Sequence, residues 1–164
     1  MEGAVSSCIF CQIARSATST TLLHKDDRVV AFQDINPSAF RSLSNFSHFH
    51  LFSVCLIGGL SITPPPPFHP PPPKGGQRSK DFLLVSHMLN VGQNLVQRDA
   101  PHAKRYRFGF HQPPLNSVNH LHLHCFALPF IPRWKRVKYS SLGPFGGFIE
   151  ADKLLDRIKP LYPL

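Results

Sequence analysis

Residues 119–127 have the sequence NHLHLHCFA. Its polar and apolar residues alternate strictly, which predicts a β-strand. Because successive side chains of a strand point to opposite faces, His120, His122 and His124 share one face and the two leucines share the other. The leucine face suits a core. Neutral histidine needs partners for two ring nitrogens, so three adjacent imidazoles predict a functional site rather than a solvated face that carries histidines by chance.

A row of imidazoles could bind a metal ion or a phosphate. At ~3.3 Å per residue, His120 and His124 lie about 13 Å apart along the strand. One zinc ion, whose ligand nitrogens lie at about 2.0–2.1 Å, could not easily take both. A phosphate fits better, because the central imidazole can attack phosphorus while a flanking one donates to the other oxygens. The net charge of +9 also favours an anionic ligand.

The 164 residues have the length of one domain. The helices and strands expected in it predict an α+β fold. A short helix is expected after residue 8. Further strands are expected at 28–32 and 104–110. Apolar residues at helical spacing predict one helix over about 81–98 and another over 150–158.

Residues 42–80 differ from the rest of the chain. Serine and phenylalanine dominate its start, and proline runs follow at Pro64–Pro67 and Pro70–Pro73. Neither a helix nor a central strand tolerates such runs. The prediction is a single domain, 1–164, interrupted by a Ser/Pro-rich, disordered segment at 42–80. Its abrupt borders are typical of an inserted or mis-spliced segment, such as a retained intron.

The histidine stretch resembles the His-φ-His-φ-His-φ-φ motif of the histidine triad (HIT) superfamily. A second block agrees, because CIFCQI at 8–13 and DRVVAFQDINP at 27–37 resemble the N-terminal half of the Hint branch, which binds nucleotides. GFHQPP at 109–114 resembles the form that replaces an Asn-Glu-Gly sequence in this branch. The resemblance covers about 8–40 and 81–159.

This resemblance implies a HIT-like fold, an antiparallel five-stranded sheet with two helices, in a homodimer. After Phe40 the family continues with a histidine that opens a central apolar strand, but this chain has Ser42–Asn45 there. One strand is therefore expected to be disrupted or replaced. Asn45–Leu56 is a candidate replacement, with His48 or His50 near the position of the lost histidine.

The resemblance also implies two sets of site residues. The catalytic set is His122, His124, His120 and Ser117. The nucleotide-binding set is Phe10, Phe32, Asp34, Ile35 and Asn116. His122 would be the nucleophile that forms an adenylyl-histidine, and the carboxylate at position 34 would accept the ribose hydroxyls.

No cofactor is expected to be required, because the chain lacks a Walker loop and a cluster of Mg²⁺-binding carboxylates. Cys8 and Cys11 form a CxxC pair, which alone is a weak signal for zinc. Related HIT proteins complete a Cys₂His₂ zinc site with the first histidine of the triad. Here Cys8, Cys11 and His120 would supply three ligands of a structural zinc, and the fourth is missing.

These features predict a nucleotidyl hydrolase or transferase that cleaves adenosine 5'-phosphosulfate or adenosine phosphoramidates to AMP, or to ADP with phosphate. One alternative is a nucleotide-binding protein with little or no activity, because the strand at 42–55 is disrupted. Another is a nucleic-acid binder that uses the basic stretch Arg133–Lys138, although nucleic acid is not the favoured partner. No membrane partner is expected, and the expected location is the cytoplasm, with peroxisome and nucleus left open.

Overall fold

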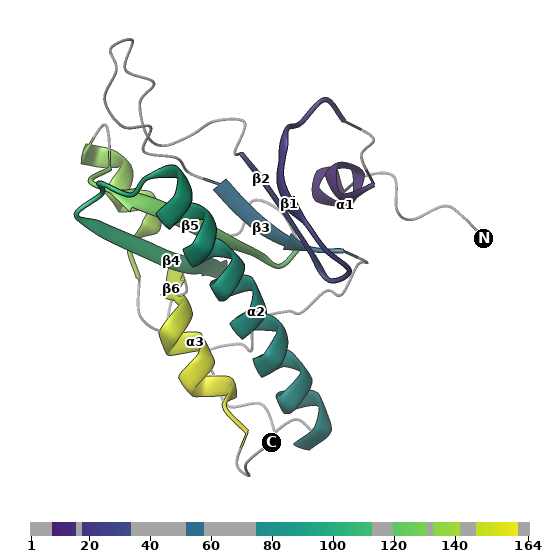
Figure 1. The fold of residues 1–164 in the computed structure, drawn as a ribbon. Helices are drawn as coiled ribbons and strands as arrows, with labels where there is room; N and C mark the ends of the chain where they lie inside the picture. Colours follow the sequence, from purple (N-terminus) through teal and green to yellow (C-terminus); the bar gives the residue numbers. More distant parts are fainter. Residues whose placement is uncertain are drawn as a thin grey trace.

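The computed structural model describes residues 8–15, 18–33, 52–57, 75–112, 120–130, 133–141 and 147–160. These residues form a six-stranded antiparallel sheet in the order β1-β2-β3-β5-β4-β6, with three α-helices and one 3-10 helix (Figure 1). The strands are β1 (Leu22–Lys25), β2 (Val29–Gln33), β3 (Phe52–Leu56), β4 (Arg105–Gln112), β5 (His122–Leu128) and β6 (Gly147–Glu150). The helices are α1 (Ile9–Ala14), α2 (Gly75–Asp99), the 3-10 helix η1 (Arg133–Tyr139) and α3 (Ala151–Ile158).

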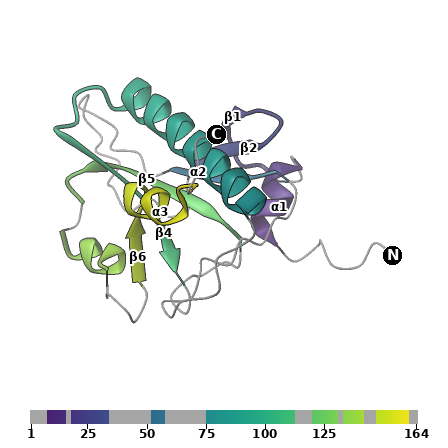
Figure 2. The ribbon, with the colours of Figure 1, turned by 90° about the horizontal axis from the view of Figure 1, so that it is seen from below.

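The main core lies between the sheet and the pair α2 and α3, which pack beside each other (Figure 2). Leu123 and Cys125 of β5 and Val54 of β3 are fully buried in it. Gly92 allows the close approach of α2, because a Cβ there would lie 2.7 Å from Sγ of Cys125. Smaller apolar clusters on the opposite face hold α1 and the end of η1 against the sheet.

The α+β fold is confirmed, and its sheet has six strands rather than five. β3 pairs with β2 on one side and β5 on the other, so the candidate replacement strand lies in the centre of the sheet. The expectation of a disordered segment is wrong for residues 52–56 and for residues 75–80, which begin α2. Short β1 and β6 were not expected, because four residues carry too little pattern to predict a strand.

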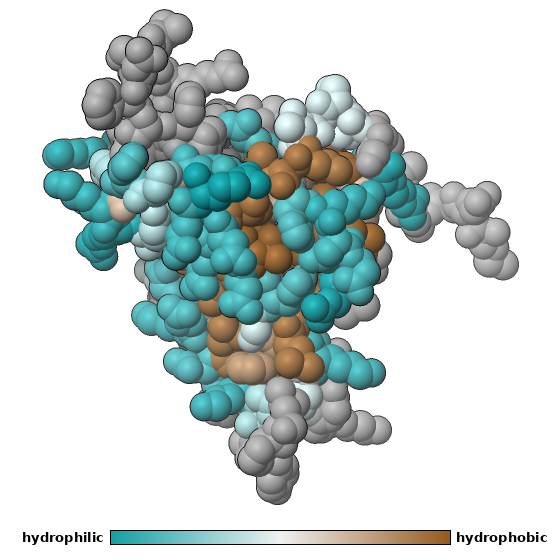
Figure 3. Space-filling model, viewed as in Figure 1, coloured by the Kyte–Doolittle hydropathy of each residue, from teal (hydrophilic) through white to brown (hydrophobic). Residues whose placement is uncertain are grey.

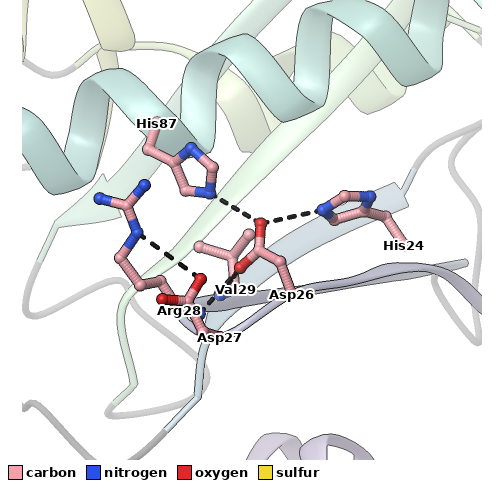
Figure 4. Close-up of polar contacts among 6 residues, drawn as sticks. All are labelled: His24, Asp26, Asp27, Arg28, Val29 and His87. Carbon is pink, nitrogen blue, oxygen red and sulfur yellow. Dashed lines mark hydrogen bonds and ion pairs between the residues drawn. The ribbon is translucent and has the colours of Figure 1, made fainter.

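An aspartate ties the β1–β2 hairpin to α2 (Figure 4). Oδ2 of Asp26 accepts hydrogen bonds from Nε2 of His24 at 3.0 Å and Nε2 of His87 at 2.8 Å. Its Oδ1 accepts the backbone N–H groups of Arg28 and Val29, each at 2.8 Å. Burial pushes the pKa of Asp26 upward, but these donors outweigh it and hold the pKa well below its ordinary value.

Hydrophilic side chains cover much of the helical side of the molecule, and apolar side chains show between them (Figure 3). Four large apolar side chains of the described residues are exposed: Ile9, Leu83, Trp134 and Val137. None of the helices in the described part of the chain is long and apolar enough to cross a membrane.

Candidate active site

The histidine face of β5 is turned away from the main core. His122 and His124 lie in the strand, and His120 precedes it in a bend. All three side chains are nevertheless buried, at 8% exposure or less. Ser53 of β3 pairs directly with His124, so this small buried hydroxyl belongs to the same face. The expected alternation is therefore correct, and the face is a sheltered site rather than a solvated strand surface.

The hydrogen bond of Nδ1 sets the tautomer of His122. Its Nδ1 lies 2.8 Å from the backbone oxygen of His120. A carbonyl oxygen only accepts, so Nδ1 carries the proton and the lone pair of the neutral ring is on Nε2. Nε2 is thus the atom equipped to attack phosphorus, as expected of a nucleophile.

His124 meets a fourth histidine from the neighbouring strand β4. Nδ1 of His111 lies 2.9 Å from Nε2 of His124, and Nε2 of His111 lies 3.1 Å from the backbone oxygen of Lys138. Burial lowers the pKa of both imidazoles, most strongly for His124, where positive charge on neighbouring groups would add to the effect. His111 is not among the site residues predicted from the sequence, although it lies in GFHQPP at 109–114.

His120 faces the CxxC pair instead of the other two imidazoles. Its Nδ1 lies 3.5 Å from Sγ of Cys8 and 3.6 Å from Sγ of Cys11. Two ligands of a tetrahedral zinc ion, at ~2.3 Å for sulfur and ~2.0 Å for nitrogen, are separated by about 3.6 Å. The three side chains therefore fit a zinc site. No fourth ligand is found with them among the residues that the structure describes.

The thiol of Cys11 is expected to be protonated without a metal ion. Burial, with the neighbouring Cys8, raises the pKa of Cys11. Burial lowers the pKa of His120, which keeps the imidazole in the neutral form that binds metals. Metal binding at this cluster would release thiol protons and would weaken as the pH falls.

Phe10 and Phe32 lie together on the α1 side of the site. Their ring centroids are 5.4 Å apart, and the ring of Phe10 is 4.8 Å from that of His122. Phe10 therefore stands beside the predicted nucleophile as well as in the small core under α1. The other predicted nucleotide contacts, Asp34, Ile35, Asn116 and Ser117, lie outside the described residues, as do His48 and His50.

The opposite end of the site is an aromatic wall. Tyr139, Phe148 and Phe126 pack around the His111–His124 pair, and Tyr139 is only 1% exposed. Tyr139 is the last residue of η1, whose outer side is basic and carries the exposed Trp134. The predicted basic surface is thus an exposed helical turn with one end beside the triad.

Comparisons with known proteins give matches over most of the chain. The family model for the C-terminal binding domain of scavenger mRNA decapping enzyme matches residues 7–140. The Arabidopsis thaliana protein HINT4, a bifunctional adenosine 5'-phosphosulfate phosphorylase/adenylylsulfatase, is 52% identical over 161 residues, which are 98% of this chain and 97% of that protein.

A more distant relative and a solved structure are also similar to most of this chain. The adenosine 5'-monophosphoramidase HINT3 of Xenopus tropicalis is 33% identical over 160 residues, 93% of this chain and 88% of its own. A histidine triad protein from Clostridium difficile is similar in structure, with a TM-score of 0.56 and 25% identity. That likeness covers 76% of this chain and 92% of the other.

Proposed function

This chain belongs to the histidine triad superfamily, and we propose that it is a nucleotidyl hydrolase or transferase that cleaves adenosine 5'-phosphosulfate to AMP. Adenosine phosphoramidates are the second substrate class, as the name of the HINT3 relative suggests. The observation that carries the proposal is the tautomer of His122. Its Nδ1–H is held by the carbonyl of His120, which places the reactive lone pair on Nε2.

In the proposed first step, Nε2 of His122 attacks the α-phosphorus of the nucleotide. A nitrogen–phosphorus bond forms, the bond from phosphorus to the bridging oxygen breaks, and sulfate leaves with the bonding electron pair. In the second step a water oxygen attacks phosphorus, and the nitrogen–phosphorus pair returns to Nε2. AMP is released with loss of one proton. Inorganic phosphate in place of water gives ADP.

The neighbours of His122 are suited to this chemistry. His124 would donate a hydrogen bond to a phosphate oxygen as negative charge develops there. The burial of both rings, at 5% exposure, limits competition from water. Phe10 would offer its ring to the adenine, with Phe32 behind it, and Asp34, Ile35, Asn116 and Ser117 would complete the nucleotide contacts.

The alternative of an inactive nucleotide-binding protein assumed a broken central strand. Because β3 pairs along its length with β2 and β5, the sheet beneath the histidines is continuous. This continuity favours the enzyme over the inactive alternative. Binding to nucleic acid through η1 stays a separate hypothesis, and steep salt dependence of DNA binding would be its signature.

Three further parts of the proposal rest on the family resemblance or on sequence composition. We propose a homodimer, to be tested by sedimentation. The cytoplasm is the proposed location, to be tested by microscopy of a tagged chain. A structural zinc at Cys8, Cys11 and His120 is the only metal proposed, and the steps above do not require it.

The experiment is chromatographic detection of AMP released from adenosine 5'-phosphosulfate by the purified chain. We expect His122→Ala to lower kcat by at least about 10⁴-fold, because the covalent route is lost, while AMP binding persists. His102→Ala is the matched control, since His102 is exposed in the turn after α2. Turnover that survives in His122→Ala would refute the assignment of the nucleophile.

A further inference from the structure

His111 is a half-buried titratable residue that the mechanism above does not use. It comes from β4, and its ring meets that of His124 edge-on, with centroids 4.7 Å apart and planes at 85°. The rings of Tyr139 and Phe148 lie 5.2 Å and 5.5 Å away. This packing from two other elements leaves the imidazole of His111 little freedom to turn away from His124.

The direction of the hydrogen bonds follows from the acceptor at one end. The carbonyl of Lys138 can only accept, so Nε2 of His111 carries a proton. Because burial keeps the ring neutral, Nδ1 of His111 carries a lone pair and must accept from His124. Nε2 of His124 is therefore the protonated nitrogen of that ring.

Without this acceptor, little would hold the proton of His124 at Nε2. Its other nitrogen, Nδ1, is buried and has no hydrogen-bond partner among the described residues. With His111 present, the Nε2–H tautomer gains a hydrogen bond that the Nδ1–H tautomer lacks. With His111 removed, neither ring nitrogen of His124 would have a partner among the described residues in either tautomer, and the preference would disappear.

The tautomer matters because of where these nitrogens lie. One ring nitrogen from each of His111, His122 and His124 falls within 4.8 Å of the other two. A phosphate attacked by Nε2 of His122 would enter this group of nitrogens. It would meet a donor on His124 if the proton is on Nε2, and a repelling lone pair if it is not.

We propose that His111 is a positioning residue, which keeps the proton of His124 on Nε2, the nitrogen that would donate to the reacting phosphate. The carbonyl of Lys138 fixes the tautomer of His111, and His111 in turn fixes that of His124. This role rests on the proposed function, in which His124 donates to a phosphate oxygen. The proton itself stays within the hydrogen bond until the phosphate oxygen replaces His111 as its acceptor.

The test compares His111→Ala with His111→Asn. Asparagine places its Oδ1 near the position of Nδ1 and can accept from His124, but it has no ring to titrate. We expect His111→Ala to lower kcat for AMP release from adenosine 5'-phosphosulfate by about 10- to 100-fold, the range typical for loss of an orienting partner. KM should change by less than about threefold. His111→Asn should recover most of the lost rate, and His102→Ala should match the wild type.

A second measurement does not depend on turnover. The ¹⁵N spectrum of the full chain with labelled histidine distinguishes a protonated from an unprotonated ring nitrogen. We expect Nε2 of His124 to be protonated in the wild type and in His111→Asn, and a mixture of tautomers in His111→Ala. Circular dichroism of each variant shows whether the fold is retained.

The outcomes separate this inference from the proposed function. If the wild type is active and His111→Ala keeps its kcat and its spectrum, the positioning role is refuted and the proposed function stands. If His111→Asn is folded but as slow as His111→Ala, an acceptor is not what His111 supplies, which also refutes the role. If the wild type releases no AMP, the proposed function fails, and the ¹⁵N spectrum still decides whether His111 controls the tautomer of His124.

Discussion

His122 and His124 are chemically identical side chains two residues apart, and their hydrogen bonds make them different. Nδ1 of His122 donates to a backbone oxygen, whereas Nε2 of His124 donates to another imidazole. The first ring therefore offers a lone pair at Nε2 and the second offers a proton there. A nucleophile next to a donor is the pair that nucleotidyl transfer requires.

Gly109 is the residue that allows His111 and the aromatic wall to lie where they do. It pairs with His124 on one side and Glu150 on the other. A Cβ at this position would collide with the backbone oxygen of Ile149 and with the ring of Phe148. Because a backbone atom and a packed ring cannot both move aside cheaply, only glycine fits here.

We expect Gly109→Ala to lower the free energy of unfolding by about 1–3 kcal/mol, the usual cost of overpacking. AMP release should also fall, because Phe148 packs on His111. Thermal unfolding followed by circular dichroism measures the first effect. Arg105→Ala, at an exposed position of the same strand, is the control. Unchanged stability of Gly109→Ala would mean that β6 can move aside.

The cluster of Cys8, Cys11 and His120 predicts that the purified protein contains zinc. We expect about one zinc ion per chain by mass spectrometry of the purified protein, and Cys11→Ser should lower this content together with the melting temperature. A strong chelator should destabilise the wild type in the same way. The control is Cys125→Ala, since Cys125 is buried on the opposite face of the sheet. Wild-type protein that carries no zinc after purification in zinc-containing buffer would contradict the site.

At the scale of elements, β3 is the part that makes the sheet continuous. Phe52, Val54 and Leu56 point into the core under α2, while Ser53 and Cys55 lie on the face of the histidines. FSVCL has the alternation of a strand with one face in the main core. The sequence offered Asn45–Leu56 as a candidate for this strand, but the proline runs and serine-rich sequence around it predicted disorder.

The hydrogen bonds of Asp26 are expected to contribute to the stability of the fold. We expect Asp26→Ala to lower the free energy of unfolding at pH 7 by about 1.5–3 kcal/mol, since a charged acceptor of four hydrogen bonds is lost. Urea unfolding measures this change. Asp27→Ala is the matched control, because the side chain of Asp27 is 87% exposed and its contact with Arg28 is 4.0 Å.

The same carboxylate gives a pH dependence with a definite sign. Its pKa is lower in the folded chain than the value of about 3.9 in an unfolded one. The stabilisation is therefore complete above about pH 4 and is lost as the pH falls through the folded pKa. The wild type should lose its stability advantage over Asp26→Ala below about pH 4. A constant difference down to pH 2 would show that the charge of Asp26 is not the cause.

For the whole molecule, the site is a meeting point of distant segments on one face of the sheet. α1 brings Phe10 and the two cysteines, β4 brings His111, and η1 brings Tyr139 and the carbonyl of Lys138. α2 and α3 occupy the other face, where they cover the main core, and His87 of α2 also binds Asp26 of the hairpin. The excess of positive charge, +9 over the chain, favours an anionic ligand at such a site.

From the sequence came the family, the α+β class, the face shared by the three histidines and the approximate places of β2, β4, β5 and α3. The sequence could determine them because these properties are local: alternation, helical spacing and a short motif are read from neighbouring residues. The motif also pointed to His122 as the nucleophile. That assignment, like the roles of Ser117 and Asp34, stays a prediction until it is tested.

Only the tertiary structure decided which groups meet. The pairing of β3 with β5, the contact of His111 with His124 and the approach of His120 to the CxxC pair join residues 13 to more than 100 positions apart. No local pattern encodes such contacts, because they depend on strand register and on how the sheet is covered. His120 precedes β5 and His124 lies within it, and packing gives each a different partner. His120 meets two thiols, and His124 meets an imidazole.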